Sequence, residues 1–559
     1  MKAFARLLES LVTTPSRNAK LTLLTNYFRT QPDPDRGWAL ACLAGSLELR
    51  NVTGSTLRTM AEERVDPVLF RMSYDYVGDL AETVALIWPT PKEAPDTTDT
   101  APLRLSSVVE TLATATRPQA IQHLAGWMDR LEPSERLALL KLATGGLRVG
   151  ISERLAKTAL AAMHDDDVLD RIEEMWHGLE PPYVSLLQWL DGSAAAPQVD
   201  LTHAFRPMML AHPLDNGLYS VEERRERLHE SDGADALTVA RMGERMVPAD
   251  YSAEWKWDGI RVQAVSLGGE RRLYTRMGEE ISGSFPDVVA AMDFEGVADG
   301  ELLVVRDGAV APFAELQKRL GRKSPGARIL RDAPGHIRLY DLLHDGTEDV
   351  RALPFGPRRA RLDGWFAQQP LNGKVDLSPV IAFDTWADLS ATRATARDIE
   401  QEGLMLKRLD APYVGGRPTG PWWKWKRAPL TIDCVMMYAQ RGHGKRSSFY
   451  SDYTFGAWRD GPEGAELTPV GKAYSGFTDE ELKRLDKWVR DNTTDRYGPV
   501  RAVKFGLVLE INFDAVQRST RHKSGIAMRF PRIKRIRWDK PAHEADRVST
   551  LEEMIPSEG

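Results

Sequence analysis

The spacing of apolar residues changes once along this chain, close to the segment DGSAAAPQVD at residues 191–200. Before that segment, apolar residues recur every three or four positions, as in Phe4, Leu7 and Leu11. This spacing is typical of amphipathic helices. Beyond it, short runs of alternating polar and apolar residues end in Asp-Gly or Met-Gly turns, which is typical of strands joined by hairpins. We therefore expect an all-α N-terminal domain at residues 1–200.

The remaining sequence is expected to form two further domains. Alternating segments such as YSAEWKWDG and HIRLYDLLHDG predict an α+β domain with antiparallel sheets at residues 201–427. The strand-like segments that follow, among them IDCVMMYAQ and GLVLEINF, are spaced as in a small barrel and predict an all-β domain at residues 428–559. Within the helical part, the Pro-, Thr- and Asp-rich stretch at 89–102 predicts an exposed loop.

Charge and cysteine content exclude several classes of protein. The chain carries 74 Lys and Arg residues against 80 Asp and Glu, a net charge of −6, so local clusters of cations must hold any polyanionic partner. Its two cysteines, Cys42 and Cys434, exclude a disulfide scaffold and a four-cysteine zinc module, and they fit a reducing compartment. No apolar run approaches the roughly 18–20 residues of a membrane span, and the N-terminus lacks a signal segment. These features predict a soluble, cytoplasmic protein.

One cluster of cations lies near the C-terminus. Between Arg501 and Lys540, eleven Lys and Arg residues stand against three acidic residues. Such a run is usually a solvated basic edge. Within an acidic chain it is also a candidate phosphate-binding face, and both interpretations stay open from the residues alone.

The segment Glu254-Trp-Lys256-Trp-Asp258-Gly259 points most directly to chemistry. In a strand, Glu254 and Lys256 share one face and the tryptophans lie on the other. A lysine held between two acids and beside tryptophans can act as a nucleophile only when its amine is deprotonated. Burial lowers its pKa and favours the neutral amine, whereas the neighbouring carboxylates raise the pKa. Taken alone, a lysine beside acids at the end of a strand is more often a plain ion pair.

Further segments supply the other groups that a nucleotide-transfer site needs. Besides an amine, such a site needs carboxylates for Mg²⁺, an aromatic ring to stack on a base, and cations for phosphates. The candidates are Arg261, Arg276, Glu301, Tyr340, Glu402, Lys424 and Lys426.

These segments resemble, in order, the adenylation-domain motifs of the ATP-dependent DNA ligases, a family of the covalent nucleotidyltransferase superfamily. The matching segments are KWDGIR, RMGEEIS, ADGELLVV, LYDLL, EGLMLKR and WWKWK. The stretch from Phe513 to Pro541 resembles the arginine-rich segment that closes the family's OB domain, so the resemblance implies an OB-fold barrel at 428–559. Residues 139–161, LLKLATGGLRVGISERLAKTALA, resemble the signature of the helical DNA-binding domain of longer ligases. The resemblance covers nearly the whole chain.

The resemblance also implies a role for each residue. Lys256 attacks the α-phosphate of ATP and becomes lysyl-AMP, and AMP then passes to the 5′-phosphate of a nick in duplex DNA, where the 3′-hydroxyl displaces it. Tyr340, where many relatives carry Phe, stacks on adenine. The implied ATP-binding residues are Glu254, Lys256, Arg261, Arg276, Glu301, Tyr340, Arg417, Lys424 and Lys426. Glu301 and Glu402 would bind Mg²⁺ or Mn²⁺, and Arg529 and Arg532 would align pyrophosphate. Arg417 lies one residue further from Lys424 than the family pattern expects.

The segment Gly145-Gly146-Leu147-Arg148-Val149-Gly150 has two interpretations that stay open. It is typical of a helix C-cap followed by a tight turn, and equally of backbone that approaches DNA phosphates. We name Gly145, Gly146, Arg148 and Gly150 as candidate DNA-binding residues. The expected partner is nicked double-stranded DNA, and the expected state is a monomer.

Two other functions compete with DNA ligation. An RNA ligase or mRNA-capping guanylyltransferase uses the same lysine motif, but neither requires the helical N-terminal region. A non-catalytic nick-binding protein would be expected to have lost some of Lys256, Glu301, Glu402 or Lys424, and all four are in place. An NAD-dependent ligase is disfavoured because two cysteines cannot build its four-cysteine zinc site.

Overall fold

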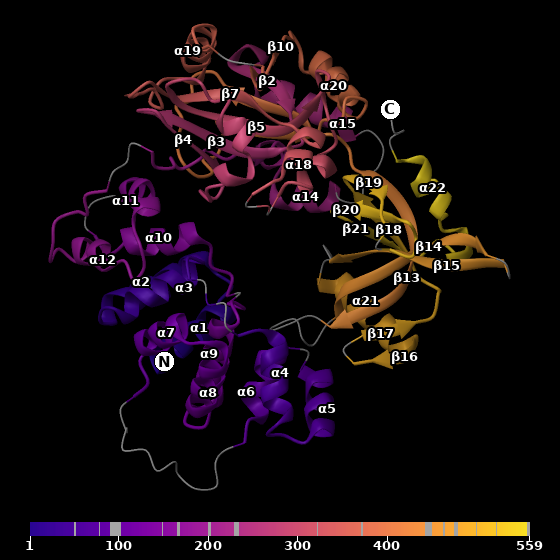
Figure 1. Cartoon of the computed structure of the whole chain (residues 1–559). Coiled ribbons are helices and arrows are strands. Elements are labelled where there is room, and N and C mark those ends of the chain that lie inside the picture. The colour runs from indigo at the N-terminus through magenta and orange to yellow at the C-terminus, as the bar shows by residue number, and fades with distance from the viewer. Residues whose placement is uncertain are drawn as a thin grey trace. The chain divides into compact units, whose positions relative to one another are not determined.

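The computed structural model of the chain divides into two compact units. Figure 1 labels the helices and strands of each. We call Met1–Asp167, Glu180–Ala196 and Pro429–Gly559 the first unit, and Val168–Leu179 and Pro197–Ala428 the second unit. The structure describes residues 1–47, 49, 52–77, 79–89, 102–147, 149–164, 168–199, 203–227, 234–320, 322, 324–370, 373–441, 450–461, 464–474, 479–498, 500–520 and 522–555.

The described residues up to Leu190 are helical, as the periodicity predicts. In the first helix, Phe4, Leu7 and Leu11 are buried on one face, which is what their spacing implies. Cys42 is buried within the third helix. The helices are α1 (Lys2–Thr13), α2 (Arg17–Thr30), α3 (Asp35–Ala44), α4 (Gly54–Glu62), α5 (Pro67–Val77), α6 (Leu80–Ile87), α7 (Leu105–Thr114), α8 (Arg117–Met128), α9 (Pro133–Ala143), α10 (Glu153–Ala161), α11 (Leu169–Met175) and α12 (Val184–Leu190).

The structure describes only the two ends of the expected loop, whereas the expected boundary follows the last helix of this region. Residues 90–101 of the predicted loop at 89–102 lie outside the described residues. After α12 ends at Leu190, residues 191–199 form neither helix nor strand.

The second unit contains two sheets that are mainly antiparallel. The first has the strand order β1-β12-β11-β2-β10, with β1 (His212–Pro213), β12 (Trp422–Lys426), β11 (Gly403–Arg408), β2 (Tyr251–Lys256) and β10 (Val380–Ile381). The second follows the order β4-β3-β5-β7-β8, and β6 and β9 pair at its side. Its strands are β3 (Ile260–Leu267), β4 (Glu270–Thr275), β5 (Gly296–Arg306), β6 (Ala309–Val310), β7 (Gly335–Asp345), β8 (Glu348–Asp349) and β9 (Val375–Leu377).

Helices accompany both sheets of this unit (Figure 1). Ala253, Leu404 and Trp425 of the five-stranded sheet belong to one apolar core together with Trp386 of α20 and Met242 of α15. The helices are α13 (Asp215–Leu218), α14 (Val221–Arg227), α15 (Ala234–Arg245), α16 (Pro286–Val289), α17 (Phe313–Gln317), α18 (Ala327–Asp332), α19 (Phe355–Ala367) and α20 (Trp386–Ala394). The opposite face of β2, β11 and β12 is therefore left for polar side chains.

The C-terminal strands form a curled sheet that closes on itself. The pairs β13–β14, β14–β15, β15–β21, β21–β18 and β18–β13 make a closed ring, and β17 and β16 extend it from β13. Cys434 lies in its apolar core. The elements are β13 (Leu430–Arg441), β14 (Tyr450–Gly461), β15 (Gly464–Tyr474), α21 (Asp479–Asp491), β16 (Thr493–Tyr497), β17 (Val500–Val503), β18 (Val508–Phe513), β19 (Ala515–Arg518), β20 (Ile526–Arg529), β21 (Arg532–Arg537) and α22 (Val548–Glu553).

Within the part of the chain that the structure describes, every helix is too short or too polar to cross a membrane.

Candidate active site

Lys256 is the last residue of β2 and lies directly beside Glu402. In the antiparallel pair of β2 and β11, Lys256 is opposite Gly403, so the residue before β11 comes next to the lysine. The backbone N–H of Glu402 donates to the carbonyl of Lys256 at 2.9 Å. The Lys256 Nζ and a Glu402 carboxylate oxygen are 2.6 Å apart. The expected nucleophile therefore forms an ion pair with one of the two expected metal-binding carboxylates.

The next strand, β12, brings two more lysines to the same face. Lys424 and Lys426 alternate with Trp423 and Trp425, and both tryptophans are buried in the apolar core behind the sheet, as the alternation predicts. The Lys426 Nζ lies 3.1 Å from the Glu402 carboxylate that also binds Lys256. Burial lowers the pKa of Lys424, and the neighbouring cation Arg417 lowers it further. The ammonium groups therefore converge around a single carboxylate.

The turn after Lys256 requires glycine for steric reasons. A Cβ built on Gly259 would lie 2.5 Å from the Leu302 carbonyl oxygen and 2.8 Å from the Glu301 Cγ, closer than any side chain can pack. This glycine therefore lets the chain pass directly over β5 between the two sheets. Its close approach brings Lys256 and Glu301 to opposite sides of one cavity.

The two carboxylates in this cavity differ in their pKa. Burial raises the pKa of Glu301 to about 8, although the charges of Lys256 and Arg261 oppose the shift. Burial also acts to raise the pKa of Glu402, but the adjacent Lys256 and Lys426 outweigh it and hold the pKa at about 2. Without an added cation, Glu402 is ionised near neutral pH and Glu301 is largely protonated.

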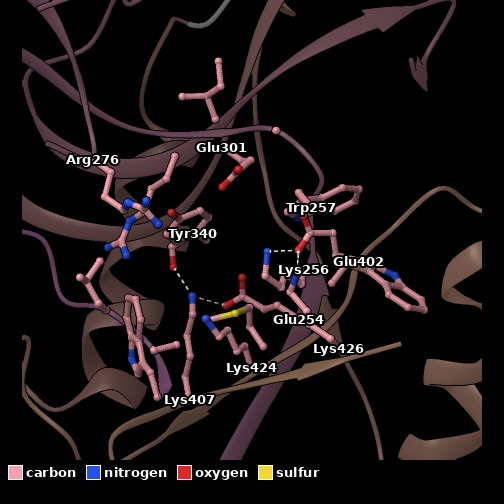
Figure 2. Close-up of a pocket in the computed structure, with 18 of the residues that line it drawn as sticks. Glu254, Lys256, Trp257, Arg276, Glu301, Tyr340, Glu402, Lys407, Lys424 and Lys426 are labelled. Atoms are coloured by element: carbon pink, nitrogen blue, oxygen red, sulfur yellow. Dashed lines mark hydrogen bonds and ion pairs between the residues drawn. The ribbon is translucent and has the colours of Figure 1, made fainter. Parts of the chain in front are cut away.

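Glu254 has a partner that sequence reasoning missed. It is buried, and its carboxylate lies 2.8 Å from the Lys407 Nζ. Lys407 also donates to the backbone carbonyl of Tyr340 at 3.1 Å, and its Nζ lies 4.6 Å from the centre of the Tyr340 ring. Figure 2 shows these three side chains together at one end of the pocket. Alternation in EGLMLKR placed Lys407 on the same face as Met405, so the signal was present in the sequence.

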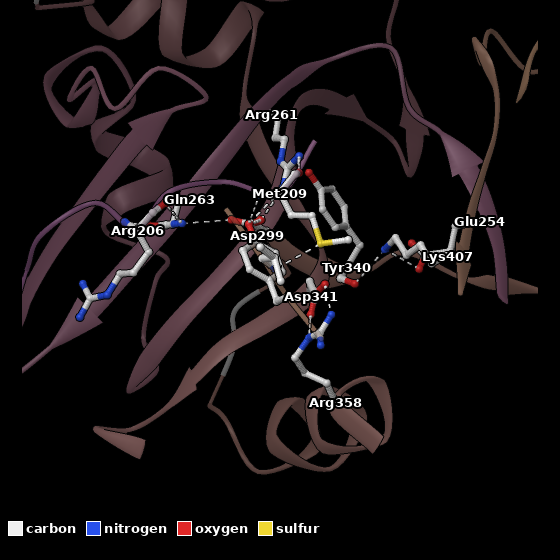
Figure 3. A network of polar contacts seen from close by, with 12 residues as sticks. Arg206, Met209, Glu254, Arg261, Gln263, Asp299, Tyr340, Asp341, Arg358 and Lys407 are labelled. Carbon is white, nitrogen blue, oxygen red and sulfur yellow. Dashed lines mark hydrogen bonds and ion pairs between the residues drawn. The ribbon is translucent and has the colours of Figure 1, made fainter. Parts of the chain in front are cut away.

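A buried polar network binds the Arg261 guanidinium (Figure 3). Its guanidinium donates to Asp299 at 2.6 Å, to the Tyr413 hydroxyl oxygen at 3.2 Å and to the Met209 carbonyl at 2.5 Å. Asp299 accepts further bonds from the Tyr413 hydroxyl and from Gln263. The same guanidinium lies 5.8 Å from the centre of the Tyr340 ring. Arg261 thus borders the pocket while three protein groups fix its orientation.

These residues line one cavity of about 580 Å³ (Figure 2). Its volume and its mixture of aromatic and charged walls suit a small polar ligand such as a nucleotide. The candidates that line it are Glu254, Lys256, Arg261, Arg276, Glu301, Tyr340, Glu402, Arg417, Lys424 and Lys426, and the further lining residues include Trp255, Trp257, Met405, Lys407 and Trp422. All adenylation-site candidates named from the sequence are therefore together in the second unit.

The carboxylates fit a Mg²⁺ ion that takes its remaining ligands from phosphates and water. No group of three or more His, Cys, Asp or Glu side chains in the described residues is arranged to hold a metal by itself. Mg²⁺ commonly binds through one or two carboxylates and substrate phosphates, so Glu301 and Glu402 suffice. The raised pKa of Glu301 fits as well, since a nearby divalent cation favours the ionised carboxylate.

The remaining candidates lie in the first unit. Arg529 ends β20 and Arg532 begins β21, where its guanidinium lies 3.2 Å from Asp514. Gly145 follows α9 with φ of +67°, and Gly146 donates to the Lys141 carbonyl at 2.9 Å, which is the Schellman C-cap arrangement. Gly150 also has positive φ. Arg148 lies outside the described residues. The C-cap interpretation is therefore confirmed for Gly145 and Gly146, and the contact of this segment with DNA stays a prediction.

Comparisons with known proteins give consistent results over the whole chain. Three family models match: "DNA ligase N terminus" over residues 1–161, "ATP dependent DNA ligase domain" over 234–426 and "ATP dependent DNA ligase C terminal region" over 446–540. A probable DNA ligase of Koribacter versatilis is 30% identical, over 100% of this chain and 97% of the relative. DNA ligase 1 of Korarchaeum cryptofilum is 29% identical, over 99% and 98%.

One solved structure has the same fold over most of its length. The chain described as Pmar-Lig_Pre. superposes with a TM-score of 0.58 at 15% identity, and the alignment covers 96% of this chain and 99% of that chain. At this identity the similarity concerns the fold alone.

Proposed function

The chain belongs to the family of ATP-dependent DNA ligases, and we propose that Lys256 is the residue to which AMP becomes attached. The observation that carries this proposal is the position of the Lys256 amine inside the cavity, 2.6 Å from Glu402 and on the same face as Lys424 and Lys426. No other lysine of the cavity combines a strand end with a glycine turn against the opposite sheet.

In the proposed first step, the neutral amine of Lys256 attacks the α-phosphorus of ATP. A nitrogen–phosphorus bond forms, the bond between the α-phosphorus and the bridging oxygen breaks, and pyrophosphate leaves with that electron pair. The Lys256 ammonium that pairs with Glu402 passes one proton to solvent before the attack, and the nitrogen passes a second proton to solvent as the phosphoramidate forms. This ion pair would weaken if Glu402 held a divalent cation, because the cation would compete with the Lys256 ammonium for the same carboxylate.

Charge stabilisation is the main task of the other cations. Phosphoryl transfer develops negative charge on the phosphate oxygens, and fixed ammonium groups lower the barrier without reorganising. Lys424 and Lys426 face the α-phosphate in this proposal, and Arg276, Arg261 and Arg417 surround the ribose and phosphates. When bound by Glu301 and Glu402, Mg²⁺ or Mn²⁺ would supply further neutralisation of phosphate charge.

Recognition of the base is assigned to the end of the pocket near Glu254. Tyr340 stacks on adenine, and the Glu254 carboxylate accepts from the adenine amino group. Lys407 acts as a positioning residue in this proposal, because its bond at 2.8 Å fixes the Glu254 carboxylate. A guanine would present its own carbonyl oxygen to that carboxylate, and the two oxygens would repel each other.

The same pocket then serves nicked double-stranded DNA. AMP passes from Lys256 to the 5′-phosphate of the nick, and the 3′-hydroxyl displaces AMP to seal the phosphodiester.

We assign residues 1–200 to a helical DNA-binding domain, residues 201–427 to the adenylation domain and residues 428–559 to an OB-fold barrel that carries Arg529 and Arg532. The closed ring of β13, β14, β15, β21 and β18 supports the barrel assignment. We propose a cytoplasmic monomer.

The test is covalent labelling of the protein with ATP that carries α-³²P in the presence of Mg²⁺, followed by a denaturing gel. The wild-type protein should become labelled, and Lys256→Ala should reduce the labelling by several orders of magnitude, because it removes the nitrogen that bonds to phosphorus. Lys318→Ala is the matched control, since Lys318 is an exposed lysine of the same unit and is absent from the cavity lining.

Two outcomes would contradict the proposal. Labelling that persists in Lys256→Ala would assign the covalent bond to another residue. Sealing of nicked RNA with no sealing of nicked DNA would replace the DNA substrate by RNA.

A further inference from the structure

A second cavity lies at one end of the C-terminal sheet and is dominated by arginines. It has a volume of about 340 Å³ and is lined by Arg441, Tyr450, Arg490, Thr493, Arg496 and Arg501. These residues come from β13, β14, α21, β16 and β17, all in the first unit. No residue of the nucleotide pocket contributes to it.

Sheet register places like charges directly beside one another in this cavity. Arg496 of β16 and Arg501 of β17 are opposite each other in an antiparallel pair. Arg441 of β13 is opposite Tyr450 of β14, and β13 also pairs with β17. Like charges that are directly opposite in a sheet destabilise it. The arrangement therefore costs the folded protein free energy unless a counter-charge is bound.

The described residues supply little of that counter-charge. Arg490 forms an ion pair with Asp486 at 2.6 Å. For Arg441, Arg496 and Arg501, no described carboxylate lies within ion-pairing distance, and the Arg501 guanidinium instead donates to the backbone carbonyls of Gly498 and Val500. The Nε of Arg441 is buried and has no hydrogen-bond partner among the residues that the structure describes. A buried donor without a partner is costly, so this N–H is available to a ligand.

From these observations we propose that the cavity binds a phosphate group of the DNA backbone. Guanidinium groups bind phosphate oxygens through paired N–H donors, and several of them around one cavity suit a group with two unesterified oxygens. The assignment of this phosphate to DNA rests on the proposed function, because a ligase must bind a duplex that carries one phosphate per nucleotide. Free inorganic phosphate has the same chemistry, and the experiment separates the two sources.

The experiment measures the affinity for nicked duplex DNA as a function of salt concentration, using the full chain. The double variant Arg441→Gln/Arg496→Gln should bind about tenfold more weakly at 0.1 M salt. The slope of log K against log salt should also fall by about one, because a lost phosphate contact releases fewer counterions. The matched control is Lys483→Gln/Lys487→Gln, which removes the same charge from exposed positions of α21 outside the cavity and should leave the slope nearly unchanged.

Thermal unfolding distinguishes a ligand site from a structural cluster. Without DNA, the Arg441→Gln/Arg496→Gln variant should melt at the same temperature as the wild type or higher, because the substitutions relieve repulsion between arginines. A lower melting temperature would show that the arginines support the fold, and it would overturn the proposal.

The source of the phosphate is tested by adding sodium phosphate, with sodium chloride at equal ionic strength as the reference. One outcome is that phosphate raises the melting temperature of the wild type but not of the variant, while both proteins show the same slope of log K for DNA against log salt. In that case the site binds a free anion and the DNA assignment is wrong. Equal slopes with no effect of phosphate would overturn the site altogether. Labelling of the wild type with ATP is a separate readout, so failure of the proposed function remains distinguishable from failure of the arginine site.

Discussion

At the scale of single residues, the buried pair of Glu254 and Lys407 links base recognition to stability. Both side chains are almost fully buried, and each is the main counter-charge of the other. Burial lowers the pKa of Lys407, while the Glu254 carboxylate opposes the shift. Removing Lys407 leaves the buried Glu254 carboxylate with the more distant Arg359 guanidinium, 3.8 Å away, whereas replacing both residues removes the buried ion pair.

This ion pair predicts that substitutions of Glu254 and Lys407 have non-additive effects on the free energy of unfolding. Lys407→Met should lower the free energy of unfolding by about 3–5 kcal/mol, and it should raise the ATP concentration needed for half-maximal labelling. Glu254→Gln/Lys407→Met should be more stable than Lys407→Met alone, because the isolated carboxylate is gone. Urea unfolding of both single variants and the double variant measures the coupling. Strictly additive free energies would show that the pair contributes nothing.

A second residue-scale prediction concerns His344 of β7 and low pH. Burial, together with the cation Arg206, lowers the pKa of His344 to about 4. The unfolded chain binds this proton near pH 6.5 and the folded chain only near pH 4, so folding stability should fall as the pH drops through this window. From the linkage relation, the loss is about 2–3 kcal/mol.

The measurement is the free energy of unfolding between pH 4 and pH 7 for the wild type and His344→Gln. The variant should lose stability less steeply, because glutamine does not titrate. The same pH slope in both proteins would mean that other groups govern the acid response.

At the scale of secondary-structure elements, three neighbouring strands assemble the reactive face. Alternation along β12 sends Trp423 and Trp425 into the core and Lys424 and Lys426 into the cavity. The register of β11 between β2 and β12 places Glu402 beside Lys256 and Lys426. The face exists only while this register is kept, because a shift of one residue would exchange lysines and tryptophans.

The end of α9 gives a prediction at the same scale. Gly145 has φ of +67°, so Gly145→Ala should lower the free energy of unfolding by about 1 kcal/mol. Gly146 has no positive φ, and a Cβ there would meet the Thr144 Oγ1 at 3.3 Å and the Lys141 Cδ at 3.4 Å, both of them side-chain atoms that can shift by a few tenths of an ångström. Gly146→Ala should therefore cost little stability, and it should weaken binding of nicked DNA if this turn contacts the backbone.

Thermal unfolding and DNA-binding titrations of the two variants distinguish a role in capping α9 from a role in contacting DNA. Gly45→Ala is the matched control, since Gly45 also follows a helix with positive φ. Normal DNA affinity in Gly146→Ala would leave the turn with a structural role alone.

At the scale of the whole molecule, the two anion-binding cavities belong to different units. The nucleotide pocket is built entirely from the second unit, and the arginine cavity entirely from the first. A ligand of one cavity should therefore stabilise its own unit by mass action and affect the other unit less.

Hydrogen–deuterium exchange of the full-length Lys256→Ala variant, which cannot become labelled, tests this separation. ATP at 100 times its dissociation constant should raise the opening free energy of β2, β11 and β12 by up to about 2.7 kcal/mol, and hydrogen exchange in these strands should slow accordingly. The strands β13, β14 and β18 should exchange at unchanged rates. Equal protection of both sets would show that the units respond to ATP together.

Much of the fold and of the site could be predicted from the sequence, because local periodicity decides which face of a helix or strand is apolar. The helical N-terminal region, the strands from Tyr251 to Lys256 and from Trp422 to Lys426, and the inward tryptophans all follow from spacing. The resemblance of short motifs then indicated the family and most of the charged residues that line the pocket.

Only the tertiary structure decided which charges meet. Lys407 pairs with Glu254 from a distant segment, Arg261 pairs with Asp299 and Tyr413, and Arg496 lies opposite Arg501. These contacts depend on strand register and on burial, which bring together residues that spacing along the chain leaves unrelated. The opposite pKa shifts of Glu301 and Glu402 have the same origin, since an identical carboxyl group titrates according to the water and cations around it.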